Sequence, residues 1–453
     1  MKKLVFLIFL LSQNLIEAQT ISKKEAIEDL ELLKKSIEDF NPALPHYHPE
    51  FASQSDQLIQ TISEDAVSML ELYTSASTIC AFANEGHFKV GNRNDAFNKG
   101  ILNNEKGYLP IQVKIVSGQL WVYGDFSNEQ LLKRGERIMT INGIQSNDIL
   151  NRFLELTPSD GNIETYAYRK IEDKFSLLFY FHIEQSDAFT ISLLDENQNE
   201  RTITIQALVT SDQIGNIKKY YPKEDTPTAK TEGFYELKLE STYAYLKLPS
   251  FDFRRVNKYE VKSKKLYKAI FQELRDKRVG HLIIDLRDNT GGRNEFADDI
   301  VPYVLKDIPD HSFLKKTISW SGKTKTYKLP KPSELVFKGQ IYVLVNGKTF
   351  SAGSTLARYL KEYGNAICIG TETGTRYEGF AAGSEHRVVL PNSKITIDIP
   401  RYHIRFPQST KQQTINRGLL PDHEIELNFD VYTTKRDPYL EKAISLINST
   451  PKR

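Results

Sequence analysis

The chain has 453 residues, of which 40% are hydrophobic and 26% charged, and its 60 basic and 58 acidic residues leave a net charge of +2. This balance is typical of a soluble globular protein of about three domains and gives no sign of a nucleic-acid or polyanionic partner. Two cysteines and nine histidines show no zinc spacing such as HExxH or paired CxxC, so no metal and no other cofactor is expected.

Residues 1–18 have the pattern of a secretory signal peptide. Two lysines precede the apolar run Leu4–Leu11, and Ala18 offers a small-residue cleavage point. The apolar run is too short for a membrane span, and no later segment is long enough for one. We therefore expect the mature chain to start near Gln19 and to be exported in soluble form, either to the periplasm or out of the cell.

Residues 19–105 are predicted to form a helical region. Apolar side chains recur at helical spacing at Ala26, Leu30, Leu33 and Ile37, and more helical sequence follows from about residue 51. The region closes with the glycine-flanked turn NEGHFKVG, which contains His87. Taken alone, a single histidine of this kind is more often structural or exposed than functional.

Residues 106–210 change to short strand-like runs, interrupted by a helical insert at about 149–181. Within them, GERIMTINGIQ at 135–145 fits a hairpin that turns at Asn-Gly. The string resembles the core of PDZ domains, which bind extended peptide ends by strand addition. The long insert departs from a compact PDZ domain, which leaves peptide binding open. The polar, proline-bearing residues 211–232 are interpreted as a linker.

Residues 233–435 alternate strands and helices, which predicts an α/β domain with a largely parallel sheet, and residues 436–453 are expected to form a closing helix or tail. The motif LIIDLRDNTGG is a buried strand that ends in Gly291 and Gly292. Paired glycines let the backbone approach a ligand closely, so one of their N–H groups is a candidate oxyanion donor. A simple strand-to-helix turn is the alternative.

Ser351 lies in the segment IYVLVNGKTFSAGSTLARYLKEYG, which predicts a buried strand, a tight turn and a helix. Free N–H groups and the positive end of the helix dipole gather at such a helix start, so Ser351 there is a candidate nucleophile beside an oxyanion site. An ordinary N-cap serine is the commoner reason for this placement.

These motifs stand in one order along the chain: the His87 turn, the PDZ-like string, the strand ending in two glycines, the Ser351 turn, and INRGLLPD at 415–422. In this order they resemble the C-terminal-processing peptidases, also called tail-specific proteases. The resemblance implies a multidomain α+β protein with an N-terminal helical region, a PDZ-like β domain and a crotonase/ClpP-like α/β catalytic domain. It also implies serine endopeptidase activity on unfolded or C-terminal segments of a polypeptide substrate.

Within this family the serine is paired either with a lysine or, in the tricorn branch, with a histidine. Arg376 stands where the resemblance would put the lysine. A guanidinium stays protonated at any working pH, so Arg376 cannot accept the proton of Ser351. The resemblance to the tricorn branch instead implies His87 as the base. It further implies that Ala352 N–H, together with the backbone of the two glycines, holds the oxyanion.

The sequence departs from the tricorn pattern in two places. The glutamate expected just before Asn416 is Ile415, and an acid often found three residues after the serine is Ser354. Glu372 and Glu385 are the candidate replacements for an acid that orients the histidine.

Two alternatives to a peptidase therefore stay open. One is a weak or inactive family member that binds peptides or a small hydrophobic ligand, and the other is an esterase that uses the same pair. The sequence predicts no oligomeric state, and it does not decide whether Cys80 and Cys368 pair or are two separate buried thiols.

Overall fold

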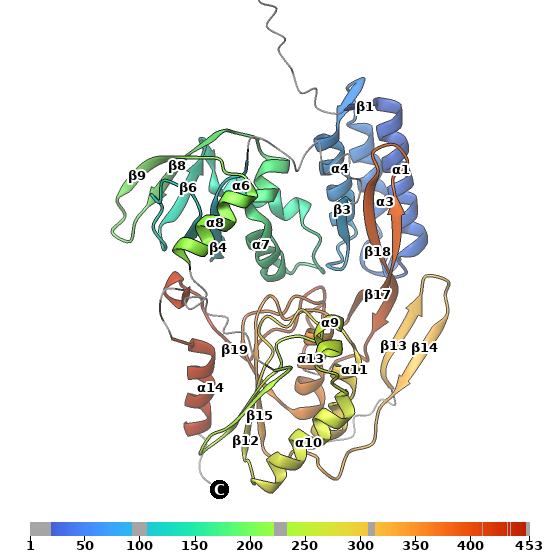
Figure 1. The fold of residues 1–453 in the computed structure, drawn as a ribbon. Coiled ribbons are helices and arrows are strands. Elements are labelled where there is room, and N and C mark those ends of the chain that lie inside the picture. Colours follow the sequence, from blue (N-terminus) through green and yellow to red (C-terminus); the bar gives the residue numbers. More distant parts are fainter. Residues whose placement is uncertain are drawn as a thin grey trace, which may run out of the picture.

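The computed structural model describes residues 20–92, 107–221, 233–306, 313–409, 411–432, 434 and 436–449 (Figure 1). The predicted signal peptide at 1–18 and part of the predicted linker, 222–232, lie outside these residues. None of the helices within the described ranges combines the length and the apolar character that crossing a membrane requires.

The N-terminal part is a helical layer with three short strands. Its elements are β1 (Thr20–Ser22), α1 (Lys23–Phe40), α2 (Leu44–Tyr47), α3 (Phe51–Gln60), β2 (Ala66–Ser68), α4 (Met69–Phe82) and β3 (Lys89–Asn92). Helix α1 begins with a capping box, in which Ser22 and Glu25 satisfy each other's backbone N–H groups. The four apolar positions predicted to form its buried face are all buried, so this helix is confirmed.

The middle part is an antiparallel sheet in the order β4-β5-β6-β8-β9, which we call the middle sheet. Its elements are β4 (Ile111–Val116), β5 (Gln119–Asp125), β6 (Arg137–Ile141), β7 (Ile144–Gln145), α6 (Ser146–Leu156), α7 (Glu164–His182), β8 (Ala188–Leu194), β9 (Glu200–Gln206) and α8 (Thr210–Tyr220). The hairpin predicted at Asn142 and Gly143 joins β6 to β7, and both residues have positive φ.

Helix α8 (Thr210–Tyr220) corrects the prediction of an irregular linker for residues 211–220. None of its residues is buried, although Ile214, Ile217 and, at its C-cap, Tyr221 recur at helical spacing. The predicted helical insert is present, and it consists of α6 and α7.

The C-terminal part is built on a sheet in the order β10-β11-β12-β15-β16-β19, parallel throughout except for β10. This confirms the predicted parallel sheet. Its elements are β10 (Glu236–Leu239), β11 (Ala244–Lys247), α9 (Phe253–Lys258), α10 (Ser263–Asp276), β12 (His281–Asp285), α11 (Glu295–Asp298), α12 (Val301–Val304), β15 (Gln340–Val345), α13 (Ala352–Gly364), β16 (Ile367–Gly370), β19 (His423–Glu424), a 3-10 turn (Phe429–Tyr432) and α14 (Pro438–Ser449). Helices α10 to α13 pack on one face of the sheet, and α14 packs on the other.

A second sheet, in the order β14-β13-β18-β17, connects this part to the N-terminal helices. It contains β13 (Phe313–Ser319), β14 (Thr324–Lys328), β17 (Gly379–Val389) and β18 (Ile395–Arg405), and β3 pairs with β18. Figure 1 shows the long hairpin β17–β18 running alongside α1 and α3. Residues of this hairpin and of the N-terminal helices share one hydrophobic core. The helices therefore fold against strands made some 300 positions later in the chain.

Both cysteines are buried and free. Cys80 lies in the core that the N-terminal helices share with the hairpin, whereas Cys368 lies in the core under the parallel sheet. The structure therefore contains no Cys80–Cys368 disulfide.

Candidate active site

The turn between β15 and α13 presents Ser351 in a strained conformation. Its φ is +54° and its ψ is −123°, a backbone region that a residue with a Cβ seldom adopts. The Ser351 side chain makes no helix-capping hydrogen bond. Its backbone N–H donates to Thr375 Oγ1 at 2.6 Å, and the neighbouring Phe350 N–H donates to Asn289 O at 2.9 Å. Ser351 is therefore not an ordinary N-cap serine, because its hydroxyl is left for another contact.

That contact is with His87, whose Nε2 lies 3.1 Å from Ser351 Oγ although the two residues are 264 positions apart. Strand β3 begins two residues after His87, and its pairing with β18, Val90 opposite Ile397, brings the histidine turn to the parallel-sheet domain. The two residues predicted as nucleophile and base are thus brought within hydrogen-bonding distance.

The environment of His87 favours the neutral imidazole. Burial lowers its pKa to about 3, and the positive charges of Lys89 and Lys170 act in the same direction. Its ring packs between Phe350, with centroids 4.4 Å apart, and Phe380, at 5.5 Å and nearly parallel. A neutral imidazole with its hydrogen on Nδ1 leaves Nε2 free to accept a proton.

Neither candidate orienting acid reaches His87. Glu372 forms an ion pair with Arg417, 2.6 Å between Oε2 and Nη2, and accepts a hydrogen bond from the Gly418 N–H. Glu385 pairs with Lys89 at 2.5 Å. The Nδ1 of His87 is buried and has no hydrogen-bond partner in the described part of the chain. The expectation of an acid at 372 or 385 therefore disagrees with the structure, because each carboxylate has a cation beside it.

The predicted oxyanion donors lie next to the serine, but they are not equivalent. The Gly291 N–H already donates to Asn289 Oδ1 at 2.9 Å. A Cβ at Gly291 would lie 2.7 Å from Ala352 N and 2.8 Å from Ser351 Cβ. The missing side chain therefore leaves a space within hydrogen-bonding distance of the Ala352 N–H. That N–H and the N–H of Gly292 have no acceptor among the described residues.

Arg376 lies behind the histidine turn and is fully buried, as is its partner Glu85. Its Nη1 is 2.8 Å from Glu85 Oε1, and its Nη2 donates to the Asn84 carbonyl at 2.8 Å. The guanidinium also stacks over the Tyr47 ring, 3.8 Å from its centroid. Sequence reasoning considered Arg376 only as a base and missed this arrangement, since nothing local in the sequence links residue 376 to residue 85.

Asp160, on the loop between α6 and α7, was also missed. One carboxylate oxygen accepts the Gly86 N–H at 2.5 Å, and the other accepts the Arg376 N–H at 3.1 Å. The following helix places Tyr166 in a parallel stack on Phe350, with centroids 4.1 Å apart. The helical insert therefore supports both the histidine turn and the ring that packs on His87.

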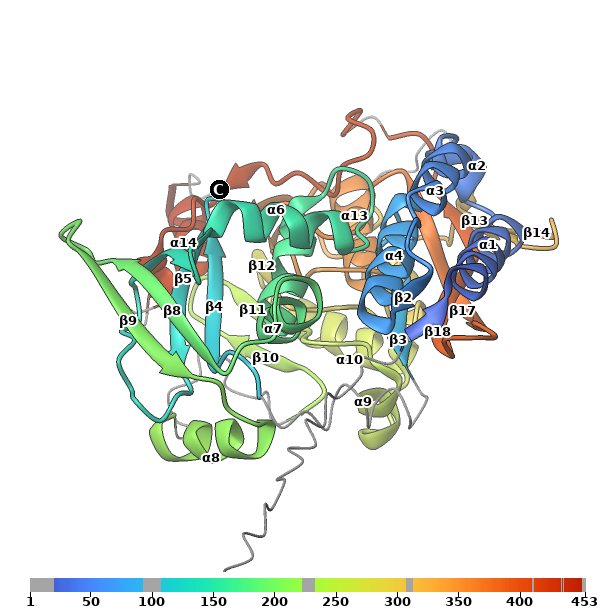
Figure 2. The same ribbon diagram turned by 90° about the horizontal axis from the view of Figure 1, so that it is seen from above.

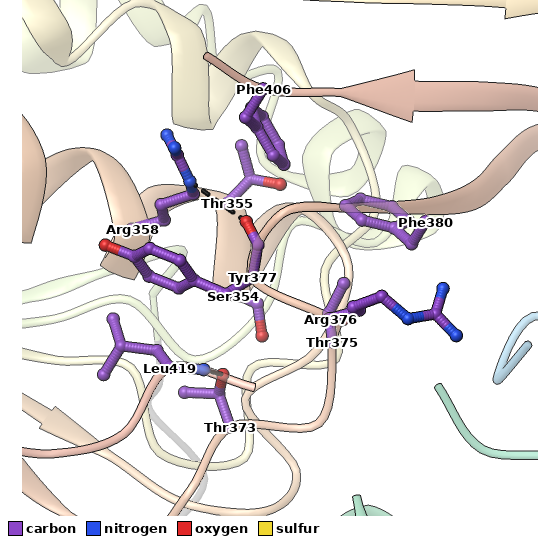
Figure 3. A pocket seen from close by; sticks show the side chains of 10 residues that line it. All are labelled: Ser354, Thr355, Arg358, Thr373, Thr375, Arg376, Tyr377, Phe380, Phe406 and Leu419. Atoms are coloured by element: carbon purple, nitrogen blue, oxygen red, sulfur yellow. Dashed lines mark hydrogen bonds between the residues drawn. The ribbon is translucent and has the colours of Figure 1, made fainter. Parts of the chain in front are cut away.

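Two cavities lie near this site. One, of about 10 Å³, has room for a single water and lies beneath the start of α13 (Figure 3). Figure 3 also shows the Arg376 guanidinium extending away from this cavity. The other, of about 310 Å³, lies between the end of α4 and the helical insert and is bordered by Asn84. In the described residues no cluster of three or more His, Cys, Asp or Glu side chains is arranged to hold a metal ion.

Figure 2, seen from above, shows α4 and β3 on one side of α13 and the helical insert on the other. The site thus lies where the three parts of the chain meet: His87 comes from the N-terminal part, Asp160 from the insert and Ser351 from the parallel-sheet part.

Comparisons with known proteins agree with this architecture. Residues 242–425 match the family model described as peptidase family S41. A structure of mature CPAF complexed with lactacystin aligns with a TM-score of 0.65 at 14% identity, covering 94% of this chain and 98% of that chain. A second structure of mature CPAF aligns with a TM-score of 0.64 at 14% identity, covering 94% and 96%. At such identities these likenesses establish the fold alone.

A photosystem II D1 C-terminal processing protease aligns with a TM-score of 0.45 at 15% identity, covering 94% of this chain and 97% of that chain. No curated protein sequence gives a significant match. The predicted resemblance to the C-terminal-processing peptidases is confirmed by the family match and the shared fold.

Proposed function

The chain carries a domain of peptidase family S41 at residues 242–425, and from this premise we propose that it is a serine endopeptidase with Ser351 as nucleophile and His87 as base. The observation that carries the proposal is the 3.1 Å contact between Ser351 Oγ and His87 Nε2. A strained serine at a helix start, opposite a neutral imidazole, is the arrangement that nucleophilic acyl transfer requires.

The reaction follows from this geometry. Ser351 Oγ attacks the scissile carbonyl carbon while His87 Nε2 takes the hydroxyl proton. The oxyanion that forms is stabilised by the Ala352 N–H, with the Gly292 N–H as the second candidate donor. His87 then returns its proton to the leaving amine, and an acyl-enzyme on Ser351 is left for hydrolysis by water.

We propose, from the order of the sequence motifs, that the substrates are unfolded or C-terminal protein segments, that the middle sheet is a PDZ-like module, and that the parallel-sheet domain is of the crotonase/ClpP type. Export through residues 1–18 belongs to the same proposal and rests on the sequence pattern alone. The β4 edge of the middle sheet is already occupied by side chains of α7. We therefore do not assign it the capture of peptides by strand addition.

The test is digestion of casein and of a peptide library by residues 19–453, together with Ser351→Ala and His87→Ala. We expect each substitution to lower kcat by at least about a thousandfold, since removing one member of such a pair removes both attack and proton transfer. A fluorophosphonate probe should label Ser351 in the unsubstituted protein and not in Ser351→Ala.

The matched control is His182→Ala. His182 Nδ1 lies 2.8 Å from the Thr74 hydroxyl, a histidine–hydroxyl contact of the same kind in another part of the molecule. It should leave cleavage unchanged. Hydrolysis of small esters without peptide cleavage would select the esterase alternative. A folded protein that neither cleaves nor is labelled would refute the proposed activity.

A further inference from the structure

We infer that Arg376 is a positioning residue for His87. Its guanidinium holds the backbone and side chain of the turn Asn84–His87 in place, a role that an acid hydrogen-bonded to the imidazole would otherwise have. The inference rests on the proposed function, because it assigns a role within the same reaction. The inference also assigns a role to residue 376. The resemblance would put a lysine base at this position, whereas the chain has an arginine, which cannot act as a base.

The contacts of Arg376 are concentrated on the residues just before His87. Two of its nitrogens hold the Glu85 carboxylate and the Asn84 carbonyl, each at 2.8 Å. The second oxygen of Glu85 accepts the Ala381 N–H at 2.8 Å, which ties the same turn to β17. The planar guanidinium therefore fixes the turn at two adjacent residues, which a lysine ammonium would do less directionally.

The rest of the turn is fixed through the backbone of Arg376. Its N–H and the Gly86 N–H donate to the two oxygens of one Asp160 carboxylate, at 3.1 and 2.5 Å. Gly86 is tightly packed: a Cβ there would lie 3.0 Å from the Phe350 ring and 3.2 Å from Asp160 Oδ1, so one of these neighbours would have to shift. Asn84, Glu85 and Gly86 are thus each held by Arg376 or by the acid bound to it.

Apart from the Ser351 hydroxyl, no polar side chain of the described residues has a hydrogen bond to the imidazole. Its Nδ1 has no hydrogen-bond partner, and the ring otherwise touches Phe350 and Phe380. Aromatic faces set the plane of the ring but do not fix its position along that plane. The distance between Nε2 and Ser351 Oγ therefore depends on where the backbone of the turn lies.

The burial of the Arg376–Glu85 pair separates this role from plain stabilisation. Both side chains are 0% exposed. A buried ion pair contributes little net stability compared with apolar side chains of similar size, although removing one partner alone is strongly destabilising. If the pair only stabilised the fold, replacing both partners together would change kcat little. If it positions His87, the same replacement removes activity from a folded protein.

The experiment compares Arg376→Lys and the double variant Arg376→Met/Glu85→Gln with the unsubstituted protein. The double variant removes both charges of the Arg376–Glu85 pair together, so neither partner is left as an unpaired buried charge. We expect kcat to fall by about tenfold to a hundredfold in both variants, with KM changing by less than about threefold, since a displaced base affects the chemical step.

The control is Arg201→Lys. Arg201 donates two hydrogen bonds of 2.7 Å to the buried Glu136 and one of 2.7 Å to the Leu131 carbonyl. It is thus bound to a carboxylate and a carbonyl as Arg376 is, in the middle sheet, although its side chain is 33% exposed. It should lower Tm without changing kcat. An equal fall in kcat for Arg201→Lys and Arg376→Lys would overturn the inference.

A second readout does not depend on activity. Histidine side-chain NMR, assigned with His87→Ala, reports whether His87 is buried and neutral. In the Arg376 variants we expect its pKa to move from about 3 toward 6.5 as the turn is released. If the unsubstituted protein cleaves nothing, the proposed function fails, while this titration still decides the inference. Unchanged kcat or an unchanged titration in folded Arg376 variants would overturn it.

Discussion

The proposed role of His87 as a base needs a neutral imidazole, and the residues around His87 favour that form. It lies between two aromatic rings, and two lysines, Lys89 and Lys170, act on it electrostatically. Burial and the two lysines all lower the pKa of His87, so the neutral form of the imidazole is favoured. The sequence was sufficient to propose the Ser351–His87 pair, because both residues lie in family motifs. It was insufficient for the surroundings, which come from residues 160, 350 and 380.

The pH dependence of cleavage should reflect this low pKa. An imidazole accepts a proton only when neutral, so a pKa near 3 keeps His87 competent well below pH 6. We expect kcat/KM to show no fall centred near pH 6.5, the ordinary value for histidine. The measurement is a kcat/KM profile from pH 4.5 to 9. A fall in kcat/KM centred near pH 6.5 would contradict the expectation.

Helix α7 connects the active site to the middle sheet. At its start, Tyr166 stacks on Phe350. Further along, its side chains bind the backbone of strand β4: Glu172 accepts the Ile115 N–H at 2.7 Å, and Arg169 donates to the Ile115 carbonyl at 2.6 Å. These are the groups of an edge strand that an added peptide strand would use. Helical periodicity predicted the insert, but it could not predict that polar side chains would bind the sheet edge.

Glu172 is the residue of α7 on which this contact most depends. We expect Glu172→Ala to lower the free energy of unfolding by about 3 kcal/mol, because it leaves a buried N–H and two cations without their acceptor. Glu172→Gln keeps an acceptor oxygen and should cost about 1 kcal/mol. Urea denaturation measures both values. Equal costs for the two substitutions would show that the backbone hydrogen bond contributes nothing.

The whole molecule is held together by a core that crosses the predicted domain boundaries. Helices α1, α3 and α4 pack against the hairpin β17–β18, which belongs in sequence to residues 233–435. At the hairpin tip, the buried Asp29 of α1 accepts the backbone N–H groups of Asn392 and Ser393. Sequence patterns showed each part separately. Contacts between residues more than 300 positions apart have no local signature, so this shared core could not be predicted.

A core substitution in α1 should therefore weaken both parts. We expect Leu33→Ala, at a position with 0% exposure, to cost about 3 kcal/mol through the cavity it leaves. Amide hydrogen exchange should then rise in α1 and in β18 together. The control, Ile205→Ala in the core of the middle sheet, should raise exchange in that sheet alone. Increased exchange confined to α1 would refute a shared core.

The pairing of β3 with β18 also determines at what point during synthesis the Ser351–His87 contact can form. A ribosome makes the histidine turn early and residues 395–405 near the end, so β3 has no partner strand for most of synthesis. Ser351 and Arg376 likewise emerge long after His87. An unfinished chain therefore contains His87 and Ser351 without their alignment. The contact between the two side chains forms only after β18 has been made and has paired with β3.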